Sequence, residues 1–234
     1  MVCADMKYRY ETHMHTAEGS RCARAKAEEQ VRFYKDRGYD GICITDHFLG
    51  GNTTVPPQLT WRKKIEMFCR GWEIAAEAGE KLGLKVFFGW EYADQGSDFL
   101  TYGLDKAWLL EMEGLLSMSI TEYLDFVRSQ GAFVAHAHPF REDFYIPRIQ
   151  LMPRQVDAVE TVNANRKDFE NERAAEYARN YGLPAIYGSD NHHASKQKRL
   201  CGIETETPIT DGADFLRVLR CGAYSCFDTA SEQE

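Results

Sequence analysis

Residues 38–47, GYDGICITDH, contain the short apolar run that decides the fold class of this chain. The run GICIT at 41–45 is typical of a strand that is buried on both faces of a parallel sheet. A helical pattern precedes it at 24–37, with apolar residues on one face and a glycine after the last turn. A helix, a buried strand and then two polar residues are typical of one unit of an α/β fold.

The same alternation of helix and strand patterns continues along the chain. Helices are predicted at 24–37, 61–82, 121–130, 169–181 and 214–220. Strands are predicted at 7–12, 41–45, 84–90, 99–104, 132–135, 157–162, 184–188 and 223–227, with a further edge strand at 201–206. Repeated β-α-β units imply a mainly parallel sheet, and about seven strands favour an irregular barrel. The sequence shows no internal repeat or linker, so we expect one domain over residues 1–234.

The composition excludes several classes of protein. The chain has 234 residues, 44% of them hydrophobic, and a net charge of −8. This acidity argues against long nucleic acids and membranes as partners, because both are bound by basic surfaces. No apolar run reaches the roughly 18 residues of a membrane span, and the N-terminus lacks the pattern of a signal peptide. The seven cysteines, Cys3 among them, are scattered without a C-x-x-C pair, so we expect reduced thiols in a cytoplasmic protein.

The histidines are concentrated in four short stretches of the chain. They are His13, His15, His47, His136, His138, His192 and His193. Each stretch follows a predicted strand, and Glu91 follows another. Because the carboxyl ends of parallel strands meet at one face of such a fold, these side chains are predicted to lie in one pocket.

These strand-end residues have the types and spacings of a metal site. Side chains alternate along a strand, so His13 and His15 point to the same side. Glu91 follows an apolar run, where a lone carboxylate is costly, and it could bridge two cations. Taken singly, each motif has a simpler explanation, such as a helix cap or an Asx turn. Taken together, the motifs predict a site for two or three divalent ions of zinc, manganese or iron.

At these positions the sequence resembles the PHP (polymerase and histidinol phosphatase) superfamily of metal-dependent phosphoesterases. The motifs that carry the resemblance are ETHMHT (11–16), GYDGICITDH (38–47), GWEYA (89–93), AHAHPF (135–140), VDAVETVNANR (156–166) and GSDNHH (188–193). They span nearly the whole chain. The resemblance implies an α/β fold, a distorted (β/α)7 barrel similar to a TIM barrel, with its metal site at the C-terminal face of the strands.

The resemblance also implies which residues hold the metals. One ion would be held by His13, His15 and Asp190. Glu91 would bridge from it to a second ion, which His138 would hold. The complete set of implied ligands is His13, His15, Glu18, His47, Glu91, Asp98, His138, Asp190 and His192.

By the same resemblance, His47 and His192 would hold a third ion. Glu18 and Asp98 stand near positions where many family members have an acid or a histidine. As oxygen ligands they would make the site harder, which favours manganese or iron over zinc. Asp46 would orient a ligand or coordinate directly.

The implied reaction is the hydrolysis of a phosphoester by a hydroxide that bridges two metals. The residues assigned to catalysis are Glu91, Asp190, His192 and Asp46. Glu18 is a further candidate for proton transfer. Arginine is well suited to bind the phosphate group of the substrate, and Arg141 is the first choice for this role. The other candidates for the phosphate are Arg21, Arg24, Lys198 and Arg199.

The leading hypothesis is a phosphomonoesterase for a small phosphorylated substrate, similar to histidinol-phosphate phosphatase. The alternatives with the same chemistry are a nucleotide or oligonucleotide phosphodiesterase, an exonuclease and a phosphotyrosine-protein phosphatase. An amidohydrolase-type metal hydrolase also begins with H-x-H, and a regulatory metal-binding domain would catalyse no reaction. The sequence leaves the substrate, the metal and the oligomeric state open.

Overall fold

The fold is built around one curved β-sheet. The computed structural model describes residues 7–230. Within them the strands are β1 (Tyr8–Glu11), β2 (Gly41–Ile44), β3 (Lys85–Asp94), β4 (Ser97–Tyr102), β5 (Phe133–Ala137), β6 (Ala158–Asn163), β7 (Ala185–Gly188), β8 (Cys201–Thr205) and β9 (Ser225–Asp228). They pair in the order β7-β6-β5-β4-β3-β2-β1-β8-β9. Beyond the ends of β1 and β7, Met14 pairs in parallel with Asn191, which nearly closes the sheet into a barrel.

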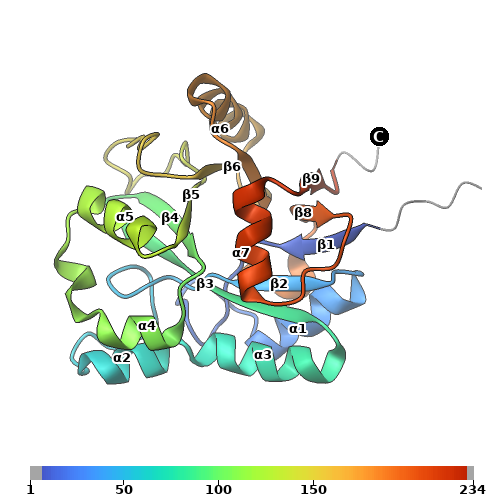
Figure 1. Cartoon of the computed structure of the whole chain (residues 1–234), viewed down its shortest axis with the longest axis horizontal. Helices are drawn as coiled ribbons and strands as arrows, with labels where there is room; N and C mark the ends of the chain where they lie inside the picture. The colour runs from blue at the N-terminus through green and yellow to red at the C-terminus, as the bar shows by residue number, and fades with distance from the viewer. Residues whose placement is uncertain (1–6, 231–234) are drawn as a thin grey trace, which may run out of the picture.

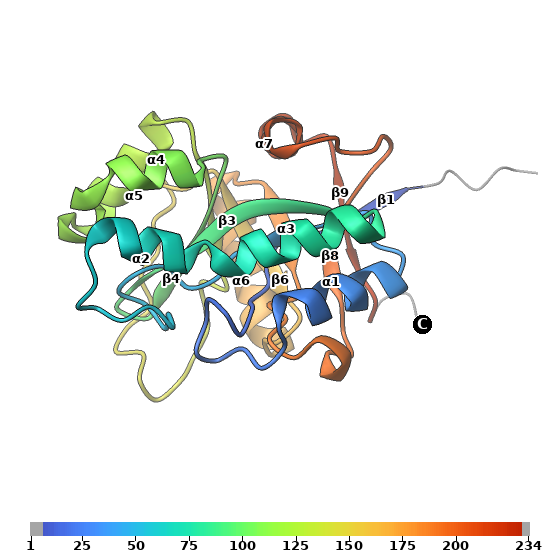
Figure 2. The ribbon, with the colours of Figure 1, turned by 90° about the horizontal axis from the view of Figure 1, so that it is seen from below.

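Helices cover the outside of this sheet. They are α1 (Ala27–Asp36), α2 (Trp61–Phe68), α3 (Arg70–Leu82), α4 (Lys106–Glu111), α5 (Ile120–Ser129), α6 (Asp168–Tyr181) and α7 (Gly212–Cys221). Figure 1 shows α2, α4 and α5 grouped on the side of the molecule opposite β8 and β9, with α7 in front of the sheet. Seen from below in Figure 2, α1 and α3 run alongside each other next to β3. The α/β class and the barrel shape predicted from the sequence are confirmed.

The sheet departs from a regular series of seven β-α units. β4 runs antiparallel to both β3 and β5 and follows β3 without an intervening helix. Asp94 pairs with Ser97, and the turn residues between them, Gln95 and Gly96, have positive φ values of 48° and 93°. A two-residue turn of this kind has the twist that a hairpin requires. The regular (β/α)7 count is therefore not observed, but β4 begins at the face where β3 ends.

The predicted helices and strands differ from the structure at a few places. The predicted helix at 61–82 is divided at Cys69 into α2 and α3. Helix α4 and the short 3-10 helices η1 (Glu113–Ser117) and η2 (Ala194–Lys196) lie outside the predicted elements. These three pieces have six, five and three residues, which is too short to produce a clear periodic pattern.

Aromatic residues fill the space between the sheet and its helices. Phe215 of α7 stacks on Phe87 of β3 with ring centroids 4.6 Å apart. Trp90 of β3 donates a hydrogen bond of 2.6 Å from Nε1 to the hydroxyl of Tyr123 in α5. Both helices are thereby held against β3, the strand that carries Glu91.

The cysteines of the described part are not joined to one another. Its free thiols are those of Cys22, Cys43, Cys69, Cys201, Cys221 and Cys226. Cys3 lies outside the described residues. Among residues 7–230, no helix is long and apolar enough to cross a membrane.

The substitution Gly202→Ala tests the pairing of β8 with β1. The added β-carbon would collide with the backbone oxygen of Tyr10 in the neighbouring strand. We expect Gly202→Ala to lower the free energy of unfolding by about 1–3 kcal/mol, the usual cost of overpacking. Urea and thermal unfolding measure this change. Gly114→Ala is the matched control, because a β-carbon there meets nothing within 4 Å; equal stability of the two variants would contradict the prediction.

Candidate metal centre

The loop after β1 directs two imidazoles into the mouth of the barrel. His13 and His15 are fully buried, and Met14 between them packs in the hydrophobic core. Glu11, the last residue of β1, accepts hydrogen bonds from the backbone N–H groups of His13 and Ser189. The end of β1 is thereby tied to the end of β7, so the histidine motifs that follow these strands meet.

His13 and His15 form a first group of metal-binding side chains with Asp190. The Nε2 atoms of the two histidines lie 3.2 Å apart. Asp190 Oδ1 lies 3.4 Å from Nε2 of His13 and 3.2 Å from Nε2 of His15. Since bonds from zinc to nitrogen and oxygen are about 2 Å long, ligand atoms at such separations can share one ion.

Glu91 lies at the centre of the site. Its Oε1 is 3.1 Å from Nε2 of His138 and 3.5 Å from Nε2 of His13, and these three residues form a second group. Its Oε2 is 3.4 Å from Nε2 of His15 and 2.7 Å from Nδ1 of His47. One carboxylate thus faces four imidazoles, as a bridging ligand would.

A third group contains His15, His47 and His192. The ring of His15 lies 4.5 Å from the ring of His47 and 4.3 Å from that of His192, measured between centroids. His192 also meets Cys22, with 3.1 Å between Nε2 and Sγ. The three groups overlap through His13 and His15, so they form one continuous centre.

The charges in the site favour ionised carboxylates and a neutral imidazole. Burial opposes a charged Glu91, but His47 and other histidines hold its pKa well below the usual range. Burial likewise opposes a charged Asp190, and the histidines around it hold its pKa well below the usual range. Burial, together with His192 and His47, lowers the pKa of His15 to about 3. Ionised carboxylates and a neutral His15 are the states in which these side chains bind metals. Burial opposes a charge on His13 and His47, but the carboxylates beside them raise the pKa of both well above the usual range, so these two imidazoles lose a proton when they bind an ion.

The donor atoms present fit divalent cations. The buried carboxylates of the site are those of Glu11, Asp46, Glu91, Asp98, Glu160 and Asp190. Glu91 Oε2 and His47 Nδ1 lie 2.7 Å apart, and Asp98 Oδ2 lies 2.7 Å from Nη2 of Arg141. Buried charges are costly unless they are paired, so this concentration of carboxylates is what bound cations would stabilise further.

Two residues of the metal-binding groups have a backbone conformation that residues other than glycine rarely adopt. The φ angle is 26° at His138 and 52° at Asp190. Such conformations cost of the order of 1–3 kcal/mol and cluster at functional sites. Glu160 accepts the backbone N–H of His138 at 3.0 Å, and Asn165 donates to the backbone oxygen of Asp190 at 2.5 Å. These hydrogen bonds hold both strand ends in place.

Buried side chains behind the ligands orient the imidazoles. Glu160 Oε1 lies 2.8 Å from Nδ1 of His13. Ser20 Oγ lies 3.1 Å from Nδ1 of His15 and donates a hydrogen bond to Asp46. Because Nδ1 is engaged in both histidines, their Nε2 atoms are directed at the metal-binding groups.

Two of the predicted site residues have other roles. Glu18 accepts a hydrogen bond from the backbone N–H of Ala27 at the start of α1, so it caps this helix and lies outside the three groups. Asp46 accepts hydrogen bonds from the backbone and the side chain of Thr16. Its carboxylate is engaged by the loop after β1, and it also accepts from Ser20, which faces His15, as a residue that orients a ligand would. Asp46 and Glu18 lie outside the three groups, so their assignments as ligands and in proton transfer stay predictions.

Asp98 lies in the site but faces a cation of the protein. Its Oδ2 is 2.7 Å from Nη2 of Arg141 and 3.9 Å from Nε2 of His138. Burial and the nearby Glu91 raise the pKa of Asp98, which Arg141 partly offsets. The structure thus brings Asp98 to the edge of the second group without making it a member of any of the three.

A cavity of about 390 Å³ opens over these groups. The ligands Glu91 and His192 line it together with Arg141 and Arg166. Arg141, the first choice for the phosphate, thus lines the cavity. Within residues 7–230, Arg166 Nε is buried without a hydrogen-bond partner, and sequence reasoning did not single out this residue.

The other cations proposed for the phosphate do not line this cavity. Arg21 and Lys198 are exposed, and Arg24 lines a separate cavity on the surface. Arg199 is paired with Asp228, with 2.6 Å between Nη2 and Oδ2. These four side chains lie away from the cavity, because the direction of a loop side chain depends on contacts that a local sequence pattern does not contain, and their role with phosphate stays a prediction.

The two remaining histidines lie apart from the metal-binding groups. His136 stacks on Phe99 with ring centroids 4.7 Å apart. Burial and the neighbouring His138 lower the pKa of His136 to about 3, so it is a neutral core residue. His193 is exposed.

Several residues that complete the site are absent from the sequence predictions. They are Glu11, Ser20, Cys22, Glu160 and Arg166. Glu160 has a signal in the sequence, because an acid inside the apolar strand DAVETV must be paired to be tolerated. Arg166 closes the motif VDAVETVNANR, which carries the resemblance to the superfamily but assigns no role to this arginine. Ser20 and Cys22 lie in an irregular loop and have no comparable signal.

A family model matches a short part of the chain. A family model described as PHP-associated matches residues 168–196, the stretch from α6 to η2 that includes Asp190 and His192. No curated protein sequence matches the chain.

Solved structures share the fold. A two-domain protein from Bacteroides vulgatus containing a predicted PHP-like metal-dependent phosphoesterase has a TM-score of 0.67 at 15% identity, over 95% of this chain and 65% of that one. A protein from Bifidobacterium adolescentis assigned as a metal-dependent phosphoesterase has a TM-score of 0.58 at 17% identity, over 92% and 96%. An amidohydrolase from Chromobacterium violaceum, with bound sulfate and no metal, has a TM-score of 0.56 at 15% identity, over 81% and 89%. At these identities the likeness shows the fold; together with the family model it supports the PHP superfamily, as the motifs indicated.

Glu160→Gln tests the carboxylate behind His13. An amide is a weaker partner for the imidazole N–H, so the ring loses both orientation and basicity. We expect the affinity for metal to fall by about 10–100-fold, as for other residues that orient a ligand. Calorimetric titration with zinc and with manganese measures the change. Glu172→Gln, on the exposed face of α6, is the matched control; if both variants bind metal equally well, Glu160 does not orient the ligand.

Proposed function

We propose that this chain is a metal-dependent phosphoesterase that hydrolyses a small phosphomonoester. The observation that carries the proposal is the meeting of three metal-binding groups with two arginines at one cavity. Metal ions supply hydrolytic chemistry, and arginines recognise phosphoryl oxygens. The fold shared with proteins described as metal-dependent phosphoesterases supports the same reaction.

Some side chains of the site are suited to hold metal ions, and others are suited to hold the substrate. Divalent ions, when bound, lower the pKa of coordinated water and offset the charge of a phosphoryl group. Glu91 would bridge the first two groups, and Asp190 would supply the second anionic ligand. Since the water is activated in this way, the reaction needs no serine or cysteine nucleophile.

Arg141 and Arg166 are suited to bind the phosphate. Arg141 is fixed by Asp98 and by the backbone oxygen of Gly96, to which its Nη2 donates at 3.2 Å. Burial opposes the charge of Arg141, but Asp98 raises its pKa, so the guanidinium stays charged. Arg166 has a buried Nε without a partner in the described part of the chain, so it can donate to an oxyanion.

The size and charge of the site favour a small substrate. A cavity of about 390 Å³ is of the size that holds small molecules. The net charge of −8 argues against long nucleic acids, which bind to basic surfaces. Histidinol phosphate is the first substrate to test. A nucleotide phosphodiester would use the same groups and is the alternative.

An amidohydrolase-type reaction is the second candidate function. The fold shared with the Chromobacterium violaceum amidohydrolase supports it. That protein binds sulfate, a tetrahedral anion similar in shape to phosphate. Two arginines at the cavity favour an anionic substrate, and for this reason we place the phosphoester reaction first.

Metal removal tests the proposed reaction. The chain is stripped with a chelator, reconstituted separately with zinc, manganese and iron, and assayed on phosphomonoesters, phosphodiesters and amides. We expect the stripped protein to be inactive and a reconstituted form to hydrolyse phosphomonoesters. Glu91→Gln should bind fewer ions and lose this activity. Full activity of the stripped protein, or turnover of amides alone, would contradict the proposal.

Arg166→Ala tests the recognition of phosphate. A hydrogen bond to a charged group contributes about 1.5–3 kcal/mol, so kcat/KM for the phosphomonoester should fall about 10–150-fold. Steady-state kinetics with the best metal measure the change. Arg21→Ala is the control, because Arg21 is exposed and does not line the cavity. An unchanged kcat/KM in Arg166→Ala would show that this arginine does not bind the substrate.

A further inference from the structure

Cys22 lies at the metal centre although no sequence motif includes it. It belongs to the loop after the H-x-H motif and lines the cavity with His47 and His192. Its Sγ is 3.1 Å from Nε2 of His192, and its thiol is also in hydrogen-bonding contact with His47. A sulfur atom thus adjoins the two histidines that define the third group.

The third group lacks a donor when His15 serves the first. Nε2 of His15 is 3.2 Å from both Nε2 of His13 and Oδ1 of Asp190. Its Nδ1 faces Ser20 Oγ at 3.1 Å. With one ring nitrogen held by the serine and the other directed at the first group, His15 has no lone pair left. An ion at His47 and His192 therefore needs another ligand.

His47 and His192 are positioned to bind such an ion beside Cys22. Nδ1 of His192 faces the backbone oxygen of Asp190 at 2.7 Å, which places a ring proton on Nδ1 and makes Nε2 the nitrogen that can bind an ion. This Nε2 is the atom that meets the thiol. Nearby, Glu91 Oε2 is almost fully buried and lies 2.7 Å from Nδ1 of His47, so a carboxylate also faces this group.

We propose that Cys22 is a thiolate ligand of the third metal ion, together with His47 and His192. The inference rests on the metal centre of the proposed function and deepens it by assigning a sulfur donor to one site. When the metal–sulfur bond forms, the thiol proton leaves to solvent.

A sulfur ligand changes the metal preference of the third site. Sulfur and imidazole donors favour zinc, whereas carboxylate-rich sites also suit manganese. The harder site expected from Glu18 is therefore replaced by a softer one at this position. The first two groups, built on Glu91 and Asp190, keep their oxygen donors.

Cobalt(II) tests the sulfur ligand directly. The metal-free chain is titrated with cobalt while a sulfur-to-cobalt charge-transfer band is recorded in the near ultraviolet, and bound ions are counted by elemental analysis. We expect the band in the unchanged chain and its loss in Cys22→Ser, with one ion fewer bound per chain. Cys22→Asp should regain the ion without the band, since an oxygen donor replaces the sulfur.

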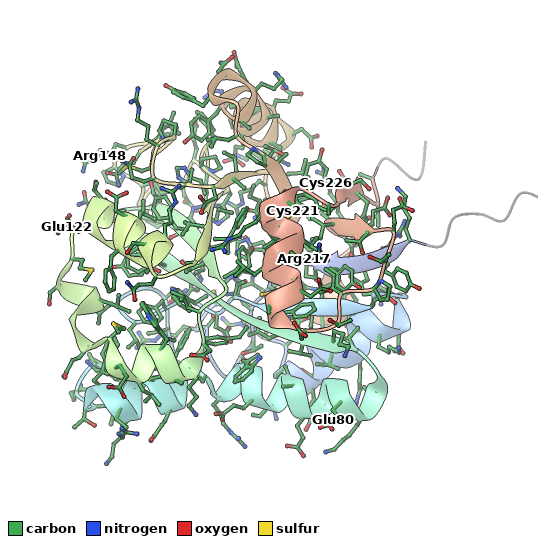
Figure 3. All side chains as sticks on the ribbon, viewed as in Figure 1. Glu80, Glu122, Arg148, Arg217, Cys221 and Cys226 are labelled. Atoms are coloured by element: carbon green, nitrogen blue, oxygen red, sulfur yellow. The ribbon has the colours of Figure 1, made fainter. Side chains whose placement is uncertain are left out.

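Cys221→Ser is the matched control. Figure 3 shows Cys221 at the end of α7, and its thiol is exposed. This variant should keep the full band. A band that persists in Cys22→Ser would overturn the proposal. If ions bind without any band, the sulfur ligand is wrong and the metal centre stands; if no ion binds, the proposed function fails as well.

Alkylation provides a second measurement that needs no variant. Iodoacetamide should label Cys221 at the same rate with and without zinc, whereas zinc should protect Cys22. Peptide mass spectrometry compares the two sites. Equal labelling of Cys22 in both conditions, with zinc shown to be bound, would contradict the proposal.

Discussion

The carboxylate of Glu91 is the constraint on which the rest of the site depends. It is almost completely buried and faces imidazoles that come from the ends of β1, β2 and β5. An isolated carboxylate in such a place costs several kcal/mol, so the fold can accept it only where positive charge or hydrogen-bond donors converge. The ends of these strands must therefore lie close together around the carboxylate of Glu91.

The direction of Glu91 is set by its apolar neighbours. Side chains alternate along a strand, so Glu91 points away from Trp90 and Tyr92. Both of these aromatic residues contact Tyr123 of α5, Trp90 through a hydrogen bond and Tyr92 through ring stacking at 3.6 Å. Burial of the aromatic face against the helix thus directs the carboxylate inward. Hydrophobic packing on one side of β3 fixes the polar chemistry on the other side.

Further buried carboxylates fix the segments that carry the ligands. Glu11 holds the backbone of His13, and Glu160 holds that of His138. Asp46 holds the backbone of the loop after His15 through Thr16. Hydrogen bonds to a charged group contribute about 1.5–3 kcal/mol each, so these acids offset part of their own burial. The segments that carry the metal-binding side chains are thus held in place by buried acids behind them.

The sequence predicted the ligand-bearing strand ends well because local patterns determine them. An apolar run followed by a histidine or an acid is readable in one chain, and parallel strands bring such ends together. Contacts between distant segments determined the parts that sequence reasoning missed. The loop after His15 follows the hydrogen bonds of Thr16 and Ser20 to Asp46, and these place Cys22 rather than Glu18 near the metal-binding groups.

The first two metal-binding groups also differ from the third in how deeply their side chains are buried. Side chains of the first two are almost fully buried: His13 and His15 are 0% exposed and Glu91 is 1% exposed. In the third group the side chains of His47 and His192 are 12% and 17% exposed. The Cys22 loop is held by backbone hydrogen bonds to two other loops, from Arg21 to Asn52 and from Arg24 to His192. Because water reaches this group first, an ion held there would exchange before the ions held at the strand ends.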